Sequence, residues 1–199
     1  MLVGQAPAET YQRASPEVAK AMICAAEKVT REDAREDELH IRHLEGFRDV
    51  LYPDVAERVR RLIDAPELHS KAALTVDATG VGAAVVDMLR KSGFTFDAVT
   101  ITGGDTESQH GWYDWRVPKR DLIGGLQVLL QTGRLKIANI LEHAETLKSE
   151  LLNFRVKVNI STGHDSYEAW REGDHDDLVL ATALACWYSE YVRKWEAVA

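Results

Sequence analysis

The segment that most constrains the fold is AALTVDATGVGAAVVDMLRKSGFTFDAVTIT, which spans residues 72–102. Its apolar run at 73–76 predicts a buried strand, and Asp77 stands at the end of that strand. A glycine-containing turn follows, then a helical pattern that Gly93 closes, and then a second buried strand over 96–102. Two strands joined by a helix in so short a length form a parallel crossover unit. The sequence therefore predicts an α/β core.

The rest of the chain carries patterns for further helices and strands. Residues 15–29 predict a helix, because Ser15 suits the N-cap and Pro16 suits the first helical position. The polar and aromatic segment 103–115 predicts a loop. The other expected elements are strands at 1–5, 39–47 and 134–138, helices over 52–68, 117–133, 141–154 and 174–192, and a hairpin formed by 155–160 and 166–170.

The bulk properties of the chain exclude several classes of protein. A length of 199 residues and a hydrophobic content of 45% fit one globular domain with a sizeable core. The two cysteines, Cys24 and Cys186, are too few for a disulfide framework and fit a reducing cytoplasm. The sequence has no apolar run of about 18 residues and no signal pattern, so we expect neither membrane insertion nor secretion.

The charge of the chain is unevenly distributed. A formal net charge of −8 excludes a surface coated in basic residues. Between residues 116 and 157, however, basic side chains outnumber acidic ones. This region is either a solvated surface of mixed charge or a surface for an anionic partner such as nucleic acid.

Asp77 is the first candidate for a functional residue. The carboxyl end of a buried parallel strand is where α/β proteins place their ligands, and Thr79, Gly80 and Gly82 follow Asp77 there. Two other interpretations stay open. Asp77 is also suited to cap the next helix, and ATGVG resembles a phosphate-cradling turn, although it lacks the Lys-Ser/Thr of a P-loop.

The segment REGDHDDLVLATALACWY, residues 171–188, places four ionisable residues directly before a long apolar run: Asp174, His175, Asp176 and Asp177. One acid at the start of a buried helix is explained by capping, because it accepts hydrogen bonds from unpaired backbone amides. Three acids repel one another unless a cation or a basic side chain neutralises them. We therefore assign Asp174 to capping, and Asp176 or Asp177 to a metal site.

Asp77 and the closing acids are more informative together than apart. If the final helix packs against the strand that ends at Asp77, the carboxylates of Asp77, Asp176 and Asp177 converge. Carboxylate oxygens are the ligands that Mg²⁺ and Mn²⁺ prefer. Two such ions about 4 Å apart activate a water and stabilise the attacking and leaving oxygens in phosphodiester hydrolysis. The sequence thus predicts a divalent metal site.

Four motifs, taken in order, resemble one known family. They are LTVDATGVGAAVVDML, VPKRDLIGGLQVLLQTGRLKIA, LLNFRVKV and WREGDHDDLVLATALACWY. Together they look like the C-terminal nuclease domain of tailed-phage terminase large subunits, the DNA-packaging enzymes. The resemblance covers residues 39–192, and it divides the chain into an atypical strand-plus-helix segment over 1–38 and a nuclease domain over 39–199.

The resemblance implies a ribonuclease H-like α/β fold, in which helices flank a central mixed β-sheet, preceded here by a helical N-terminus. It implies a metal-dependent endonuclease that cuts double-stranded DNA in the cytoplasm of a bacterial host, with Mg²⁺ or Mn²⁺ in a two-ion site. By motif, Asp77 is similar to the family's acid on the fourth strand, and Asp176 to its acid on the last helix, with Asp177 as a rival. DNA is expected near four basic residues: Lys119, Arg120, Arg155 and Lys157.

Two features of the family are missing from the sequence. No motif of the form G-x-x-x-x-G-K-[ST] occurs, so we expect the ATPase motor to be a separate partner, alongside a small terminase subunit or a portal protein. No Asp precedes Asp33, whereas the family places its first catalytic Asp on the first strand. The alternative hypothesis is therefore a non-catalytic nuclease-fold remnant that binds DNA or a protein partner.

Overall fold

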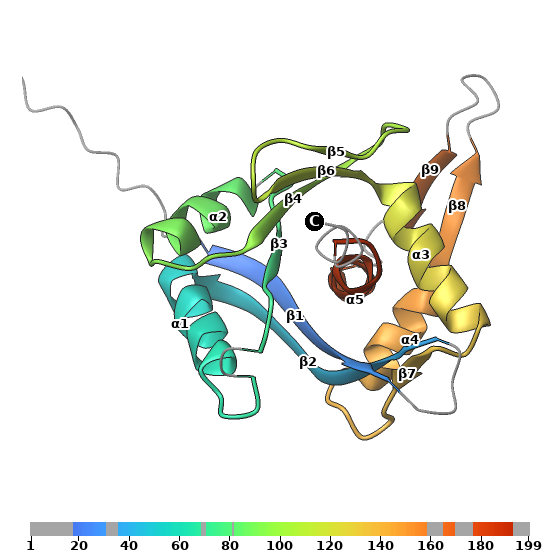
Figure 1. The fold of residues 1–199 in the computed structure, drawn as a ribbon, viewed down its shortest axis with the longest axis horizontal. Helices are drawn as coiled ribbons and strands as arrows, with labels where there is room; N and C mark the ends of the chain where they lie inside the picture. The colour runs from blue at the N-terminus through green and yellow to red at the C-terminus, as the bar shows by residue number, and fades with distance from the viewer. Residues whose placement is uncertain are drawn as a thin grey trace, which may run out of the picture.

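A buried helix near the end of the chain organises the fold, and the strands and other helices surround it (Figure 1). This helix is α5, Asp177–Trp187, and a π-helical turn over Tyr188–Val192 extends it. Its sequence is apolar on every side, as is typical of a helix that is buried all round. The computed structural model describes residues 18–30, 36–68, 71–80, 82–158, 165–169 and 177–192.

Two sheets contact α5 from different sides (Figure 1). The first has the strand order β1-β2-β7, and its strands are β1 Val18–Val29, β2 Glu38–Leu51 and β7 Leu135–Ile137. The second has the order β3-β4-β6-β5, and its strands are β3 Thr75–Asp77, β4 Asp97–Thr102, β6 Asp114–Pro118 and β5 Ser108–Gln109. Strands β3, β4 and β6 are parallel, whereas β1 and β2 are antiparallel. The parallel crossover that the sequence predicts is therefore confirmed.

Four further helices cover the sheets. Helices α1, Tyr52–Ile63, and α2, Gly82–Lys91, pack against each other, while α3, Lys119–Gln131, and α4, Ala144–Asn153, pack against α5. Strands β8, Phe154–Val158, and β9, Asp165–Ala169, form an antiparallel hairpin that continues directly from α4. Among the described residues, no helix has both the length and the apolar character to span a membrane. The fold is mixed α/β with sheets flanked by helices, as expected.

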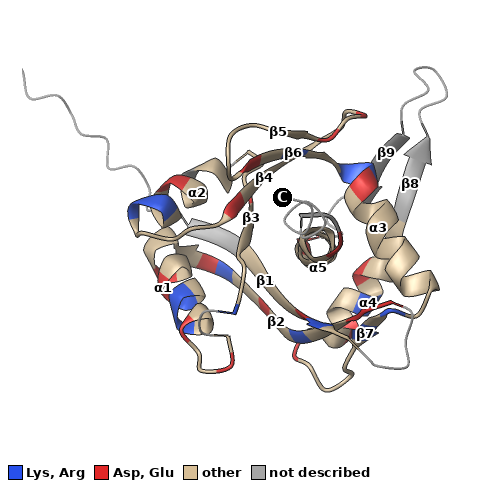
Figure 2. Ribbon diagram, viewed as in Figure 1, with Lys and Arg blue, Asp and Glu red and all other residues tan. Residues whose placement is uncertain are grey.

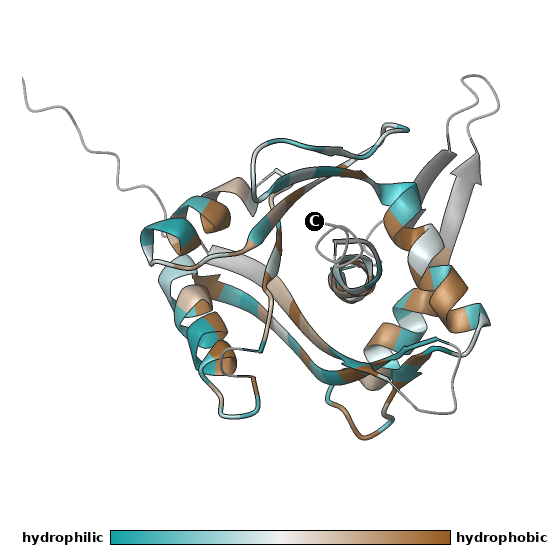
Figure 3. Cartoon of the chain, in the orientation of Figure 1, coloured by the Kyte–Doolittle hydropathy of each residue, from teal (hydrophilic) through white to brown (hydrophobic). Residues whose placement is uncertain are grey.

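The hydrophobic core lies on both faces of the second sheet. Val99 of β4 and Leu178 of α5 belong to one buried cluster, whereas Ala98, the neighbour of Val99, belongs to a second cluster with Leu89 of α2. Adjacent strand residues point to opposite faces, so β4 is buried on both sides. Figure 3 shows hydrophobic residues recurring on the strands and helices around α5.

Two tryptophans connect α5 to the second sheet. The ring of Trp115 on β6 meets the ring of Trp187 on α5 edge to face, with centroids 5.4 Å apart. The indole nitrogen of Trp115 donates to Asp97 over 2.8 Å, and that of Trp187 donates to Glu107 over 3.2 Å. Each buried indole N–H thus has an acceptor, which removes the cost of burying it.

The helix expected over residues 15–29 is wrong, because the structure has strand β1 there. β1 pairs with β2 along its whole length, from Val18 opposite Leu51 to Val29 opposite Glu38. The run VAKAMICAAEKV is rich in helix-forming residues and lacks strict alternation. Pairing with β2 and packing against α5 therefore outweigh its local propensity. The strand expected at 1–5 lies outside the described residues, and the domain boundary at residue 38 stays a prediction.

The loop expected over residues 103–115 is also wrong in part, because β5 and the start of β6 form a small hairpin within it. Trp115 and Val117 on β6 are buried, while Arg116 between them is exposed. This alternation begins only at the end of the polar segment, so it was hidden by the glycines and polar residues before it.

We predict that Arg134 is the main polar stabiliser of the carboxyl-terminal end of α5. Its guanidinium, 16% exposed, donates to the Asp37 carbonyl over 2.8 Å and to Glu190 over 2.9 Å. Arg134→Ala should lower the free energy of unfolding by about 2 kcal/mol, measured by urea denaturation. The control is Arg61→Ala, whose exposed pair with Glu57 should contribute less than about 0.5 kcal/mol. Equal losses in the two variants would contradict this prediction.

Both cysteines should be unreactive in the folded chain. Burial raises the pKa of the Cys24 thiol from 9.0 to about 11, and the nearby Thr182 hydroxyl offsets only part of this rise. Burial also raises the pKa of Cys186, with a smaller contribution from Cys24 and Glu190. At pH 8 both thiols should therefore react with a disulfide reagent only after unfolding in denaturant. The same shifts favour the folded state below pH 9, and this contribution should be lost as the pH rises towards 11 and above.

Candidate functional site

Asp77 lies at the carboxyl end of β3 and is half-buried there. Its Oδ1 atom accepts a hydrogen bond from the Thr79 amide over 2.8 Å. The Thr79 hydroxyl oxygen accepts in turn from the Ile101 amide over 2.8 Å, which ties the turn to β4. In the described part of the chain, the second carboxylate oxygen of Asp77 accepts no hydrogen bond. This oxygen is therefore available to a ligand.

The turn after Asp77 is tight, and Gly82 makes it possible. A Cβ atom at Gly82 would clash with the carbonyl oxygen of Asp77 and would lie 3.1 Å from its carbonyl carbon. Gly80 has a φ of +56°, a conformation that favours glycine. Both glycines of ATGVG thus have a role in the backbone of this turn.

The amino end of α5 is capped by a residue from another helix. The carboxylate of Glu150 on α4 accepts hydrogen bonds from the amides of Leu178 and Val179, over 3.0 and 3.1 Å, through its Oε2 atom. Asp177 is the first residue of α5 and is half-buried. Asp174 and Asp176 lie outside the described residues. Glu150 was missed in the sequence because nothing local links it to a helix that begins 27 positions later.

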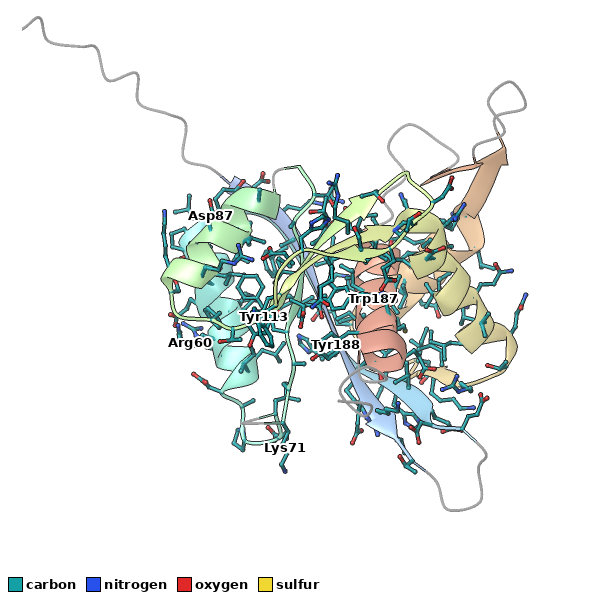
Figure 4. All side chains as sticks on the ribbon, turned by 45° about the horizontal axis from the view of Figure 1, so that its top comes forward. Arg60, Lys71, Asp87, Tyr113, Trp187 and Tyr188 are labelled. Carbon is teal, nitrogen blue, oxygen red and sulfur yellow. The ribbon has the colours of Figure 1, made fainter. Side chains whose placement is uncertain are left out.

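The ends of β3 and α5 that carry Asp77 and Asp177 face the same side of the molecule. Figure 4 shows the chain running from Lys71 into β3, and α5 running in the opposite sense towards Tyr188. β3 and α5 also pack against each other. The structure therefore agrees with the sequence in bringing these two elements together.

The two described carboxylates suit a hard cation by donor type, since Mg²⁺ and Mn²⁺ prefer carboxylate oxygens. Within the residues that the structure describes, however, no three His, Cys, Asp or Glu side chains form a group that could hold a metal ion. A site with three carboxylates would therefore need a ligand from the remaining positions, and Asp176 is the one that the sequence predicts.

Two of the four basic residues expected to bind DNA lie at the start of α3. The Lys119 ammonium lies 5.6 Å from the centroid of the Phe154 ring, which places the start of α3 against the start of β8. Arg120 donates to the carboxylate of Asp105 and, over 2.8 Å, to its carbonyl oxygen. Figure 2 shows basic and acidic residues together at the end of α3 that adjoins β6.

The other two basic residues lie on the hairpin itself. Arg155 and Lys157 are two positions apart on β8, in register with Glu168 and Ser166 of β9. Their side chains lie outside the described part. The structure thus brings the two basic segments of the sequence together through the contact between α3 and the hairpin.

Two solved structures are similar to this chain, and both are of the human cytomegalovirus terminase nuclease domain. The Mn-soaked structure has 14% sequence identity and a TM-score of 0.45, over 87% of this chain and 83% of that one. The Mn-soaked, inhibitor-bound structure has 14% identity and a TM-score of 0.44, over 89% and 87%. No family model and no curated protein matches the chain. At this identity the likeness concerns the fold alone.

We predict that Gly82 cannot be replaced without moving the turn that holds Asp77. Gly82→Ala should destabilise the protein by about 1–3 kcal/mol, because the new Cβ meets backbone atoms that cannot rotate away. The matched control is Gly124→Ala in α3, where a Cβ meets nothing within 4 Å and better helix propensity should stabilise by up to about 1 kcal/mol. Thermal unfolding of both variants checks this, and a stabilised Gly82→Ala would contradict it.

Proposed function

We propose that the chain is a metal-dependent endonuclease of the terminase type, with a ribonuclease H-like fold, that hydrolyses phosphodiester bonds of double-stranded DNA during genome packaging. The observation that carries the proposal is the common orientation of two carboxylate-bearing ends, that of β3 with Asp77 and that of α5 with Asp177. Thr79 holds the Asp77 carboxylate, and Glu150 holds the first turn of α5.

Asp77, Asp177 and Asp176 are the proposed ligands of Mg²⁺ or Mn²⁺. Such ions, when bound in a pair, activate a water and stabilise the attacking and leaving oxygens of the phosphate. In this proposal the protein contributes by holding carboxylate oxygens at fixed positions. The oxygen of Asp77 that is not bonded to Thr79 is the proposed donor on β3.

Lys119, Arg155 and Lys157 are the proposed contacts to the DNA backbone. The start of α3 and the β8–β9 hairpin lie together, so these charges would act on one stretch of duplex. Arg120 is a further proposed contact, and its guanidinium pairs with Asp105 in the structure. A separate motor, a small terminase subunit or a portal protein are the proposed protein partners.

The proposal predicts Mn²⁺-dependent nicking of supercoiled plasmid DNA. Asp77→Asn should reduce the rate by at least about 100-fold, since the loss of residues that merely support a metal ligand already costs about 10–100-fold. Asp87→Asn is the control, because Asp87 is exposed on α2 and should leave the rate unchanged (Figure 4). The rate is read from the conversion of supercoiled to open-circular plasmid on agarose gels.

Cleavage that persists in Asp77→Asn would refute the assignment of the site. Salt-sensitive DNA binding without cleavage by the unmodified chain would instead favour the alternative, a nuclease-fold module that binds DNA but does not cut it. Nicking that is independent of added Mn²⁺ or Mg²⁺ would contradict both.

A further inference from the structure

Glu150 makes a contact that the proposed reaction does not yet use. It lies on α4, half-buried, and its Oε2 atom accepts from two consecutive amides of α5, those of Leu178 and Val179. These amides belong to the first turn of α5, where no carbonyl of the same helix is available to accept from them. Glu150 therefore does the work of an N-cap side chain, but from a different helix.

The effect on the neighbouring acids follows from this contact. An ordinary N-cap residue directly precedes its helix, and the residues that precede α5 in the sequence include Asp174 and Asp176. With Glu150 bonded to the amides of Leu178 and Val179, these two amides do not require an Asp side chain as their acceptor. The N-cap role at these two amides is therefore filled by Glu150.

The charge of Glu150 acts in the same direction. Its Oε2 atom accepts from the two amides that follow Asp177, so its negative charge is held at the first turn of α5. Two neighbouring carboxylates repel each other, so a cation that binds between them is stabilised. Both the geometry and the electrostatics of the first turn of α5 thus depend on one residue of α4.

We propose that Glu150 is a positioning residue of the metal site: by capping α5 from α4, it orients Asp177 towards Asp77. This role rests on the proposed function, because it presupposes a divalent cation between β3 and α5. Glu150 itself is not a ligand in this proposal, since its Oε2 atom is occupied by the two amides.

The test measures Mn²⁺ affinity and amide exchange in the full chain. Glu150→Ala should weaken Mn²⁺ binding by about 10–100-fold, the usual effect of losing a residue that orients a metal ligand. It should also accelerate hydrogen exchange at the amides of Leu178 and Val179, followed by NMR. Glu150→Gln retains a carbonyl oxygen that can accept from both amides, so it should recover most of the protection and of the affinity.

Glu145→Ala is the matched control, because Glu145 is on the same helix but is exposed and pairs with the exposed Lys148. It should leave both measurements unchanged. Mn²⁺ binding is read from the electron paramagnetic resonance signal of the free ion, at a temperature where circular dichroism shows every variant folded.

The outcomes separate this inference from the proposed function. If the unmodified chain binds Mn²⁺, Asp77→Asn abolishes binding and Glu150→Ala does not weaken it, the metal site stands and the role of Glu150 is overturned. A purely structural cap would give this result, with faster amide exchange and a lower melting temperature but unchanged affinity. If the unmodified chain binds no Mn²⁺, the proposed function fails and the positioning role fails with it, whatever the amides show.

Discussion

The burial of α5 is the constraint on which the rest of the structure depends. Strands of two sheets and helices α3 and α4 all pack against it, and Leu178, Ala183 and Leu184 are almost completely inaccessible to solvent. A helix enclosed in this way cannot carry charge along its length, because an isolated buried charge costs several kcal/mol. Its ionisable residues must therefore gather at its ends. This explains why a cluster of acidic residues directly precedes such an apolar segment.

The two ends of α5 are held by polar contacts from elsewhere in the chain. Glu150 accepts from the amides at the amino end, where a negative charge also favours the helix dipole. At the other end, Arg134 bonds to Glu190 of the π-helical turn and to the backbone of Asp37. Burial fixes the axis of the helix, and these contacts fix its position along that axis. Asp177, the first residue of α5, consequently has a defined location relative to β3.

The parts of this fold that could be read from the sequence are those in which local pattern and tertiary environment agree. The crossover around Asp77 and helix α3 fall into this class, because their apolar periodicity matches the surface they bury. Strand β1 does not. Met22, Cys24 and Ala26 pack against the core, but the residues between them in MICAA are apolar too, so the run shows neither period clearly. The cap from Glu150 lies beyond any local pattern, since it joins residues 28 and 29 positions apart. The two carboxylates of the candidate site could be named from sequence, but the residue that holds one of them in place could not.

Capping does not account for all the acids at the start of α5, because each added carboxylate brings electrostatic repulsion. Capping alone would need one acceptor, and Glu150 supplies it for the amides of Leu178 and Val179. Every further carboxylate nearby, beginning with Asp177, adds repulsion that capping does not require. A divalent cation bound by Asp177 and Asp77 would remove this repulsion and would bind only the folded arrangement. Binding of such a cation would therefore stabilise the contact between α5 and β3, so that the chemistry of the site and the packing of the central helix reinforce each other.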